Sequence, residues 1–208
     1  MERACLYALI TDLKAYYGSL RWWPGTPDEI IIGSVLTQQT RWKYVETALS
    51  HLRDLGICSI QDIYSADIQE IEEAVRCTGF YRLKIRRIKG LAAHIIERYG
   101  GVSGMETVDT HSLREDLLSV PGVGPETADS ILCYALSRSS FVIDAYTMRI
   151  CTCAGISADK KELKALFEEI LPHESGIYRE SHAWFVEYAK EYCVKKRCDE
   201  CRIQKLRE

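Results

Sequence analysis

The chain has 208 residues, 47% of them hydrophobic, and a formal net charge of −3. These values exclude a disordered or fibrous protein and allow one globular domain or two small ones packed together. No apolar run approaches the roughly 20 residues that a membrane span requires, and the N-terminus lacks the basic-then-apolar order of a signal peptide. We therefore expect a cytoplasmic, intracellular protein with no membrane partner, whose nine cysteines are reduced or bound to metal.

The negative net charge gives the protein as a whole no attraction to nucleic acid, so any such attraction must be local. Residues 81–89 and 195–197 are rich in lysine and arginine. Each segment is suited to contact a phosphate backbone, and each is equally well explained as the solvated face of a helix.

Apolar residues recur at intervals of three and four along nearly the whole chain, as in Leu6, Leu9 and Leu13. This spacing predicts amphipathic helices, and no convincing pair of strands is present. Clusters of proline, glycine and serine predict the breaks between helices. The breaks fall at residues 24–27, 100–101, 121–125, 137–140 and 172–176. The predicted fold class is all-α.

Three tryptophans lie early in the chain. Trp22 and Trp23 precede the first break, and Trp42 follows the run Leu36-Thr37-Gln38-Gln39-Thr40. Electron-rich rings attract a flat, cationic group by stacking and cation–π contact, worth about 0.5–2 kcal/mol per ring. Alternatively, Trp22 and Trp23 simply pack in the core.

The most informative segment spans residues 112–136. Its pattern predicts an amphipathic helix, the tight turn Pro121-Gly122-Val123-Gly124 and a second helix that begins at Pro125. Glycine permits positive φ values and close approach, and proline suits the first position of a helix. The turn and the helix start therefore predict a site where backbone amides hold a phosphate without reading base sequence. A plain helix connection made tight by glycine is the alternative.

Beyond this hairpin, the apolar stretch Val142-Ile143 ends in a single carboxylate, Asp144, and a helical run follows. At a helix start the dipole and the free amides favour the charged form, so Asp144 should remain ionised. A purely structural N-cap is the alternative. Asp109, which precedes the hairpin, is interpreted as a turn or cap residue.

The glycine turn followed by an apolar-apolar-Asp element is similar to the signature of the endonuclease III superfamily of helix-hairpin-helix DNA glycosylases. Residues 36–40 resemble the DNA-wedge loop of that family, and Gly79-Phe80-Tyr81-x-x-Lys84 resembles the segment ahead of its hairpin. The resemblance covers nearly the whole chain. It implies two helical lobes with DNA in the cleft between them: a central bundle of residues 27–136, and a second lobe of residues 1–26 and 137–208.

By this resemblance, Asp144 is the catalytic residue. It would stabilise the positive charge that builds on the deoxyribose as the N-glycosidic bond breaks, and orient the attacking water. Gln39 would be the wedge that fills the space left by a flipped base, although an exposed polar loop residue would look the same. Contacts to DNA are implied for the hairpin residues Gly122, Val123, Gly124, Glu126 and Thr127.

Bifunctional members of the superfamily carry a lysine in the second hairpin helix, which forms a Schiff base with the sugar. Glu126 stands at that position here, and a glutamate cannot form an imine. Lys84, Lys89 and Lys43 are the possible substitutes. The resemblance therefore implies a monofunctional glycosylase that uses water, without AP lyase activity.

Adenine-mismatch members carry an acid that protonates a neutral leaving base, and Ser34 stands at that position here. A site without an acid suits a base that leaves easily, such as the positively charged 3-methyladenine. Trp22, Trp23 and Trp42 would then form the base pocket. The Trp-Trp-Pro pattern and the aromatic residue after the wedge loop most resemble the 3-methyladenine glycosylases.

Rival interpretations stay open. A uracil or thymine mismatch glycosylase would share Asp144, with Tyr146, Tyr44 or Gln38 binding the base. A bifunctional glycosylase/AP lyase and a non-catalytic DNA-binding module are further alternatives. The expected partner is double-stranded DNA with a damaged base, bound at the nucleoid by a monomer.

Many relatives end in four cysteines that hold a [4Fe–4S] cluster. The tail of this chain has Cys193, Cys198 and Cys201, but Arg207 stands at the fourth position. Three thiolates and an arginine do not complete the ligand set, so no cofactor is firmly predicted. The conceivable replacements for the fourth cysteine are Cys151, Cys153 and His182.

Overall fold

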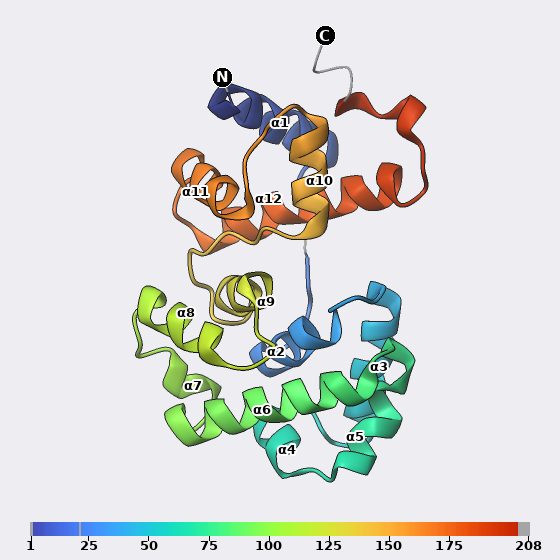
Figure 1. Ribbon diagram of the computed structural model, residues 1–208, viewed down its shortest axis with the longest axis vertical. Coiled ribbons are helices and arrows are strands. Elements are labelled where there is room, and N and C mark those ends of the chain that lie inside the picture. The colour runs from blue at the N-terminus through green and yellow to red at the C-terminus, as the bar shows by residue number, and fades with distance from the viewer. Residues whose placement is uncertain (1, 21, 204–208) are drawn as a thin grey trace. The chain divides into compact units, whose positions relative to one another are not determined.

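A computed structural model of the chain describes residues 2–20 and 22–203. Helices make up 72% of it, and no strand occurs among the described residues, so the prediction of an all-α fold is confirmed. None of the described helices is both long and apolar enough to cross a membrane. Contacts within the chain divide it into two compact units, which are described separately (Figure 1).

One unit runs from Gly25 to Leu136. Thr26 caps the first helix of this unit. The Thr26 hydroxyl accepts a hydrogen bond from the Glu29 amide at 3.2 Å, and the Glu29 carboxylate accepts one from the Thr26 amide at 3.0 Å. The elements of this unit are α2 (Pro27–Leu36), α3 (Trp42–Asp54), α4 (Ile60–Ser65), α5 (Ile68–Val75), the 3₁₀ turn η1 (Arg76–Thr78), α6 (Tyr81–Tyr99), α7 (Val102–Met105), α8 (Thr110–Ser119), α9 (Pro125–Ser130) and the π-helical segment η2 (Ile131–Ala135).

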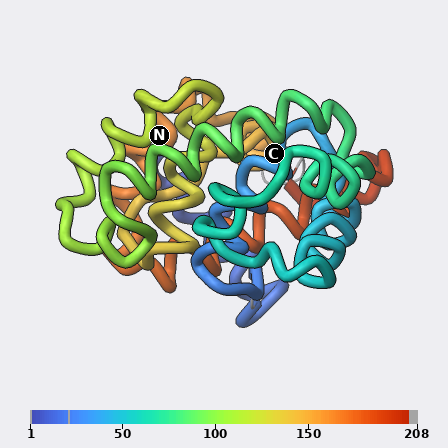
Figure 2. Tube along the Cα trace, turned by 90° about the horizontal axis from the view of Figure 1, so that it is seen from below, coloured from blue at the N-terminus to red at the C-terminus, as the bar shows by residue number. Residues whose placement is uncertain are grey.

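The long helix α6 packs against α4 and α5, and the pairing is visible from two directions (Figures 1 and 2). Its inward face carries Ile85, Ile88, Leu91 and Ile95, each at most 3% exposed. Their spacing matches the helical period expected from the sequence. Burying each such side chain stabilises the fold by about 1.5–3 kcal/mol, so this face holds α6 in place.

The other unit combines Met1–Pro24 with Ser137–Glu208. Its core contains stacked rings of Phe141 and Phe167, with centroids 4.0 Å apart, and Tyr178 meets Phe141 edge-on. Trp184 donates a hydrogen bond from Nε1 to the Gly18 carbonyl at 2.8 Å, which joins the N-terminal segment to the last long helix. The elements of this unit are α1 (Glu2–Tyr17), α10 (Ala145–Cys153), α11 (Lys160–Ile170), α12 (Ser175–Tyr188), the π-helical segment η3 (Ala189–Cys193) and the 3₁₀ turn η4 (Cys198–Glu200).

Candidate active site

The glycine turn joins α8 to α9, as the sequence predicts. Gly122 has φ +92°, in the region that favours glycine, whereas Gly124 is extended with φ −94° and caps α9 ahead of Pro125. A Cβ atom on Gly122 would lie 2.5 Å from Cγ of Arg87, but one on Gly124 would meet no atom within 4 Å. The surface over Gly124 is therefore open to an approaching group, while Gly122 is required by the packing.

The Val123 amide is engaged within the turn, whereas the sequence led us to expect that the amides of the turn are available to a phosphate. Its N–H donates to the Val120 carbonyl at 3.0 Å, and its side chain is buried. The turn closes on itself through this bond. As at any helix start, the amides of the first turn of α9 make no i→i−4 bond within the helix.

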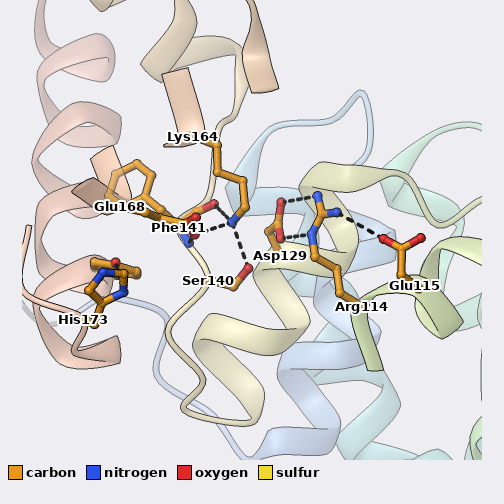
Figure 3. A network of polar contacts seen from close by, with 9 residues as sticks. Arg114, Glu115, Asp129, Ser140, Phe141, Lys164, Glu168 and His173 are labelled. Atoms are coloured by element: carbon orange, nitrogen blue, oxygen red, sulfur yellow. Dashed lines mark hydrogen bonds and ion pairs between the residues drawn. The ribbon is translucent and has the colours of Figure 1, made fainter. Parts of the chain in front are cut away.

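A buried ion pair braces the hairpin. Arg114 on α8 donates from Nε and Nη2 to the two carboxylate oxygens of Asp129 on α9, at 2.8 and 3.1 Å (Figure 3). The side chain of Asp129 is 3% exposed. Bidentate pairs fix orientation as well as distance, so the two helices of the hairpin are held at a defined angle.

The wedge loop lies between α2 and α3. Gln39 is exposed and has φ +55°, a conformation that costs a residue with a side chain about 1–2 kcal/mol. Its neighbour Gln38 donates from Nε2 to the Gly122 carbonyl at 3.0 Å and to the Thr127 hydroxyl at 3.1 Å. The Gln38 amide oxygen accepts a hydrogen bond from Arg87. The wedge loop is thereby tied directly to the hairpin.

Two of the three lysines considered as substitutes for a Schiff-base lysine hold backbone carbonyls. Lys84 is 2% exposed and donates to the carbonyls of Leu36 and Thr78 at 2.8 and 2.9 Å. Burial lowers its pKa to about 8. Lys89 donates to two carbonyls at the end of α4, and Lys43 lies over the ring of Tyr44. Lys84 thus fixes the end of α2, where the wedge loop begins.

Asp144 is the N-cap of α10, and its side chain is 14% exposed. Its Oδ1 atom accepts a hydrogen bond from the Thr147 amide at 2.7 Å, and Oδ2 lies 3.7 Å from Nε2 of His182. Burial by itself would raise the pKa of Asp144, but His182 and the Thr147 donors outweigh burial and hold that pKa below its usual value. The carboxylate is therefore ionised and partly accessible.

The segment ahead of Asp144 is held by an ion pair on α11. Lys164 Nζ lies 2.7 Å from Glu168 Oε1, and together they bind both backbone groups of Phe141 (Figure 3). The Phe141 N–H donates to Glu168 at 2.8 Å, and its carbonyl accepts from Lys164 at 2.9 Å. Lys164 also donates to the Ser140 hydroxyl. An extended segment that has no neighbouring strand thus has its backbone polar groups satisfied.

The tryptophans are divided between the two units. Trp22 is half-buried, and Lys190 Nζ lies 4.0 Å from the centre of its ring. Trp23, also half-buried, has φ +58°. Trp42 is the first residue of α3, in the unit that carries the hairpin. The ammonium group over Trp22 occupies one face of that ring.

The described part of the tail contains Cys193, Cys198 and Cys201. Among residues 2–20 and 22–203, no three histidine, cysteine, aspartate or glutamate side chains are placed to hold a metal ion. Cys201 Sγ instead lies 3.3 Å from the Tyr188 hydroxyl, which accepts a hydrogen bond from the Arg202 amide. Cys193 is half-buried and Cys198 is exposed. Arg207 lies outside the described residues.

Sequence reasoning missed three contributors. His182 was considered only as a replacement metal ligand, and nothing in its spacing points to Asp144. Lys164 and Glu168 form an ordinary i,i+4 pair in the sequence, and only the fold brings them to Phe141. A residue that acts on a partner distant in sequence leaves no local pattern.

Comparison with known proteins supports the same family. The family model described as "HhH-GPD superfamily base excision DNA repair protein" matches residues 32–173. A Methanocaldococcus jannaschii protein, provisionally named a DNA repair glycosylase, is 43% identical over 97% of this chain and 94% of its own length.

Two solved structures are also similar. The H. pylori 3-methyladenine DNA glycosylase bound to 1,N6-ethenoadenine has a TM-score of 0.80 and 27% identity, covering 89% of this chain and 97% of that one. A non-covalent endonuclease III–DNA complex has a TM-score of 0.81 at 21% identity, covering 98% and 94%, which is a likeness of fold. The chain therefore belongs to the HhH-GPD superfamily of base excision DNA repair proteins, as a DNA glycosylase of that family.

Proposed function

We propose that the protein is a monofunctional glycosylase that acts as a monomer on double-stranded DNA and removes an alkylated purine such as 3-methyladenine. The observation that carries this proposal is the Asp144 carboxylate, which is partly accessible and has its pKa held low, in a chain whose hairpin bears Glu126 in place of an imine-forming lysine.

The reaction is hydrolysis. As the N-glycosidic bond breaks, its electron pair leaves with the base and positive charge builds on the deoxyribose. The ionised Asp144 stabilises that charge electrostatically, and its Oδ2 atom, which neighbours His182, can orient a water molecule. The water oxygen bonds to the sugar carbon, and the proton passes to the carboxylate and then to solvent. An abasic site remains with its strand intact.

The hydrogen bonds of Lys84 and Lys89 support the proposal that the enzyme does not cleave the strand. Glu126 is exposed in the first turn of α9, where an imine-forming lysine would stand in bifunctional relatives. Lys84 and Lys89 each donate to two backbone carbonyls. An amine that must attack a sugar carbon needs to be accessible and free to move, so these two lysines are poor substitutes.

The choice of an alkylated purine rests on the leaving group and on the aromatic residues. Ser34 is buried, and its hydroxyl donates to the Ile31 carbonyl at 2.7 Å, so it supplies no acid to the base. A cationic base leaves without protonation. The base would stack on one of the early tryptophans, Trp22, Trp23 or Trp42. The similarity to the H. pylori 3-methyladenine glycosylase, at 27% identity, points in the same direction.

DNA contact is proposed for the hairpin and the wedge loop. The first turn of α9, with Glu126 and Thr127, would face a phosphate, and the open surface over Gly124 would let that phosphate approach. Gln39, exposed and held in a left-handed conformation, would enter the stack as a base leaves it.

The test is release of free base from three duplexes: one methylated with dimethyl sulfate, one with uracil and one with a G·T mismatch. Strand nicking is scored before and after alkali, with Asp144→Asn as the control. We expect release of 3-methyladenine, nicks only after alkali, and no release by D144N. Release only from uracil or G·T duplexes would overturn the substrate assignment, and nicking without alkali would overturn the monofunctional mechanism.

A further inference from the structure

His182 lies next to the oxygen of Asp144 that remains available for chemistry. It belongs to α12, and it is 5% exposed. Oδ1 of Asp144 is engaged by the Thr147 amide at 2.7 Å, whereas Oδ2 faces His182 Nε2 at 3.7 Å. The oxygen that the Thr147 amide leaves unengaged is therefore the one that neighbours the imidazole.

The imidazole is held in this place by the core. α12 packs against α10, and the ring of His182 meets the ring of Phe141 at 89° with centroids 6.4 Å apart. Phe141 is itself fixed by its stack on Phe167 and by the Lys164–Glu168 pair. Because these partners are buried, the imidazole cannot swing away from Asp144 without disrupting the core.

Other ionisable groups on the neighbouring helices α10 and α11 are buried or paired. Burial raises the pKa of the Cys151 thiol on α10, with Cys5 on α1 and Asp144 adding to the effect, so this thiol stays neutral. On α11, Lys164 and Glu168 are paired with each other.

We propose that His182 is a positioning residue for Asp144, which orients the carboxylate through Nε2 and sets the lower pH limit of base excision. This inference rests on the catalytic role of Asp144 in the proposed function. The 3.7 Å separation is longer than a hydrogen bond, and contacts of this kind commonly shorten when substrate binds.

The pKa of Asp144 is consistent with this role, since burial raises it and His182 is first among the influences that lower it. Without the imidazole, the effect of burial would remain. The carboxylate would then take up a proton at higher pH, and its charge would be lost where the enzyme with His182 still works.

The experiment measures single-turnover base release as a function of pH for His182→Phe, His182→Gln and the control His173→Gln. The substrate is whichever of the three duplexes the wild-type protein releases a base from. Phenylalanine keeps the ring contact but cannot donate or carry charge. Glutamine places an uncharged amide donor near the Nε2 position. His173 is exposed and lies between α11 and α12, so H173Q removes a histidine elsewhere in the same unit.

We expect H182F to lose at least about tenfold in rate at neutral pH and its acid limb to move to higher pH. H182Q should recover part of that rate, with an acid limb that is still displaced, and H173Q should match the wild type. A wild-type rate and profile in H182F, or a loss in H182Q as large as in H182F, would overturn the inference. If H182F does not fold, the displaced acid limb of H182Q decides. An active D144N would instead overturn the proposed function itself.

Discussion

Asp109 and Asp144 cap their helices in the same way. Asp109 accepts a hydrogen bond from the Ser112 amide at 3.0 Å, and Asp144 accepts one from the Thr147 amide at 2.7 Å. The prediction that Asp109 is a cap residue is confirmed. The two differ in what surrounds them, because Asp109 is exposed while Asp144 is largely buried beside His182.

This pair gives a matched test of catalysis. Asparagine is a good N-cap, so Asp144→Asn and Asp109→Asn should each change the free energy of unfolding by less than about 1 kcal/mol. D144N should lose at least about 100-fold in base release, since an uncharged amide cannot stabilise a cationic sugar, whereas D109N should keep the wild-type rate. Single-turnover release and thermal unfolding measure both effects. Equal rates for the two variants would show that Asp144 is only a cap.

The two glycines of the turn should respond differently to alanine. Gly122→Ala places a Cβ atom 2.5 Å from Arg87 at a positive φ and should destabilise the protein by about 1–3 kcal/mol. Gly124→Ala meets no atom within 4 Å and should cost less than about 1 kcal/mol. If a phosphate lies over Gly124, however, G124A should weaken the binding of a duplex that carries an abasic-site analogue. Unfolding curves measure the change in stability, and fluorescence anisotropy measures the change in DNA affinity. Wild-type affinity in G124A would show that no phosphate lies over Gly124.

Glu126→Lys should introduce the chemistry that the chain lacks. A lysine in the first turn of α9 stands where bifunctional relatives carry their imine-forming amine. We expect E126K to form a covalent complex with DNA in the presence of borohydride and to nick the strand without alkali. Glu126→Gln, which removes the charge without adding an amine, should do neither. If E126K cannot be trapped, the hairpin position does not reach the sugar.

The unit from Gly25 to Leu136 should have a stability that depends on pH through Asp116. This carboxylate accepts hydrogen bonds from Tyr99 at 2.5 Å and His94 at 2.6 Å, and pairs with Arg98 at 2.9 Å. Burial by itself would raise the pKa of Asp116, but these partners hold it below its usual value. Because the folded pKa is the lower one, the stabilisation is present above about pH 4 and is lost as pH falls through the folded pKa.

Asp116→Asn should therefore lower the free energy of unfolding by about 1–3 kcal/mol at pH 7, and the difference from the wild type should shrink below pH 4. Glu115→Gln changes an exposed neighbour and should stay within about 0.5 kcal/mol. Urea unfolding at pH 7 and pH 3 measures both variants. A D116N deficit that is the same at both pH values would contradict the role of ionisation.

Features that depend on residues close together in the sequence could be predicted, whereas features that depend on residues far apart in the sequence could not. The hairpin could be predicted because Gly122 and Pro125 obey rules of backbone conformation that hold within a few residues. Asp144 could be separated from Asp109 only by the order of elements, since each reads as a cap. His182 and Arg87 left no signal, because each acts on a partner that only the fold brings near. The occupied face of Trp22 was invisible for the same reason.

The hydrogen bond from Gln38 to the Gly122 carbonyl couples the wedge loop to the hairpin, so the two form one structural module in the design of chimeric glycosylases. A chimera that imports the hairpin of a relative alone would leave Gln38 facing a turn of different shape, so the amide that accepts a hydrogen bond from Arg87 would no longer be held in its place. Residues 36–41, Arg87 and the turn should therefore be exchanged together, although they are far apart in the chain.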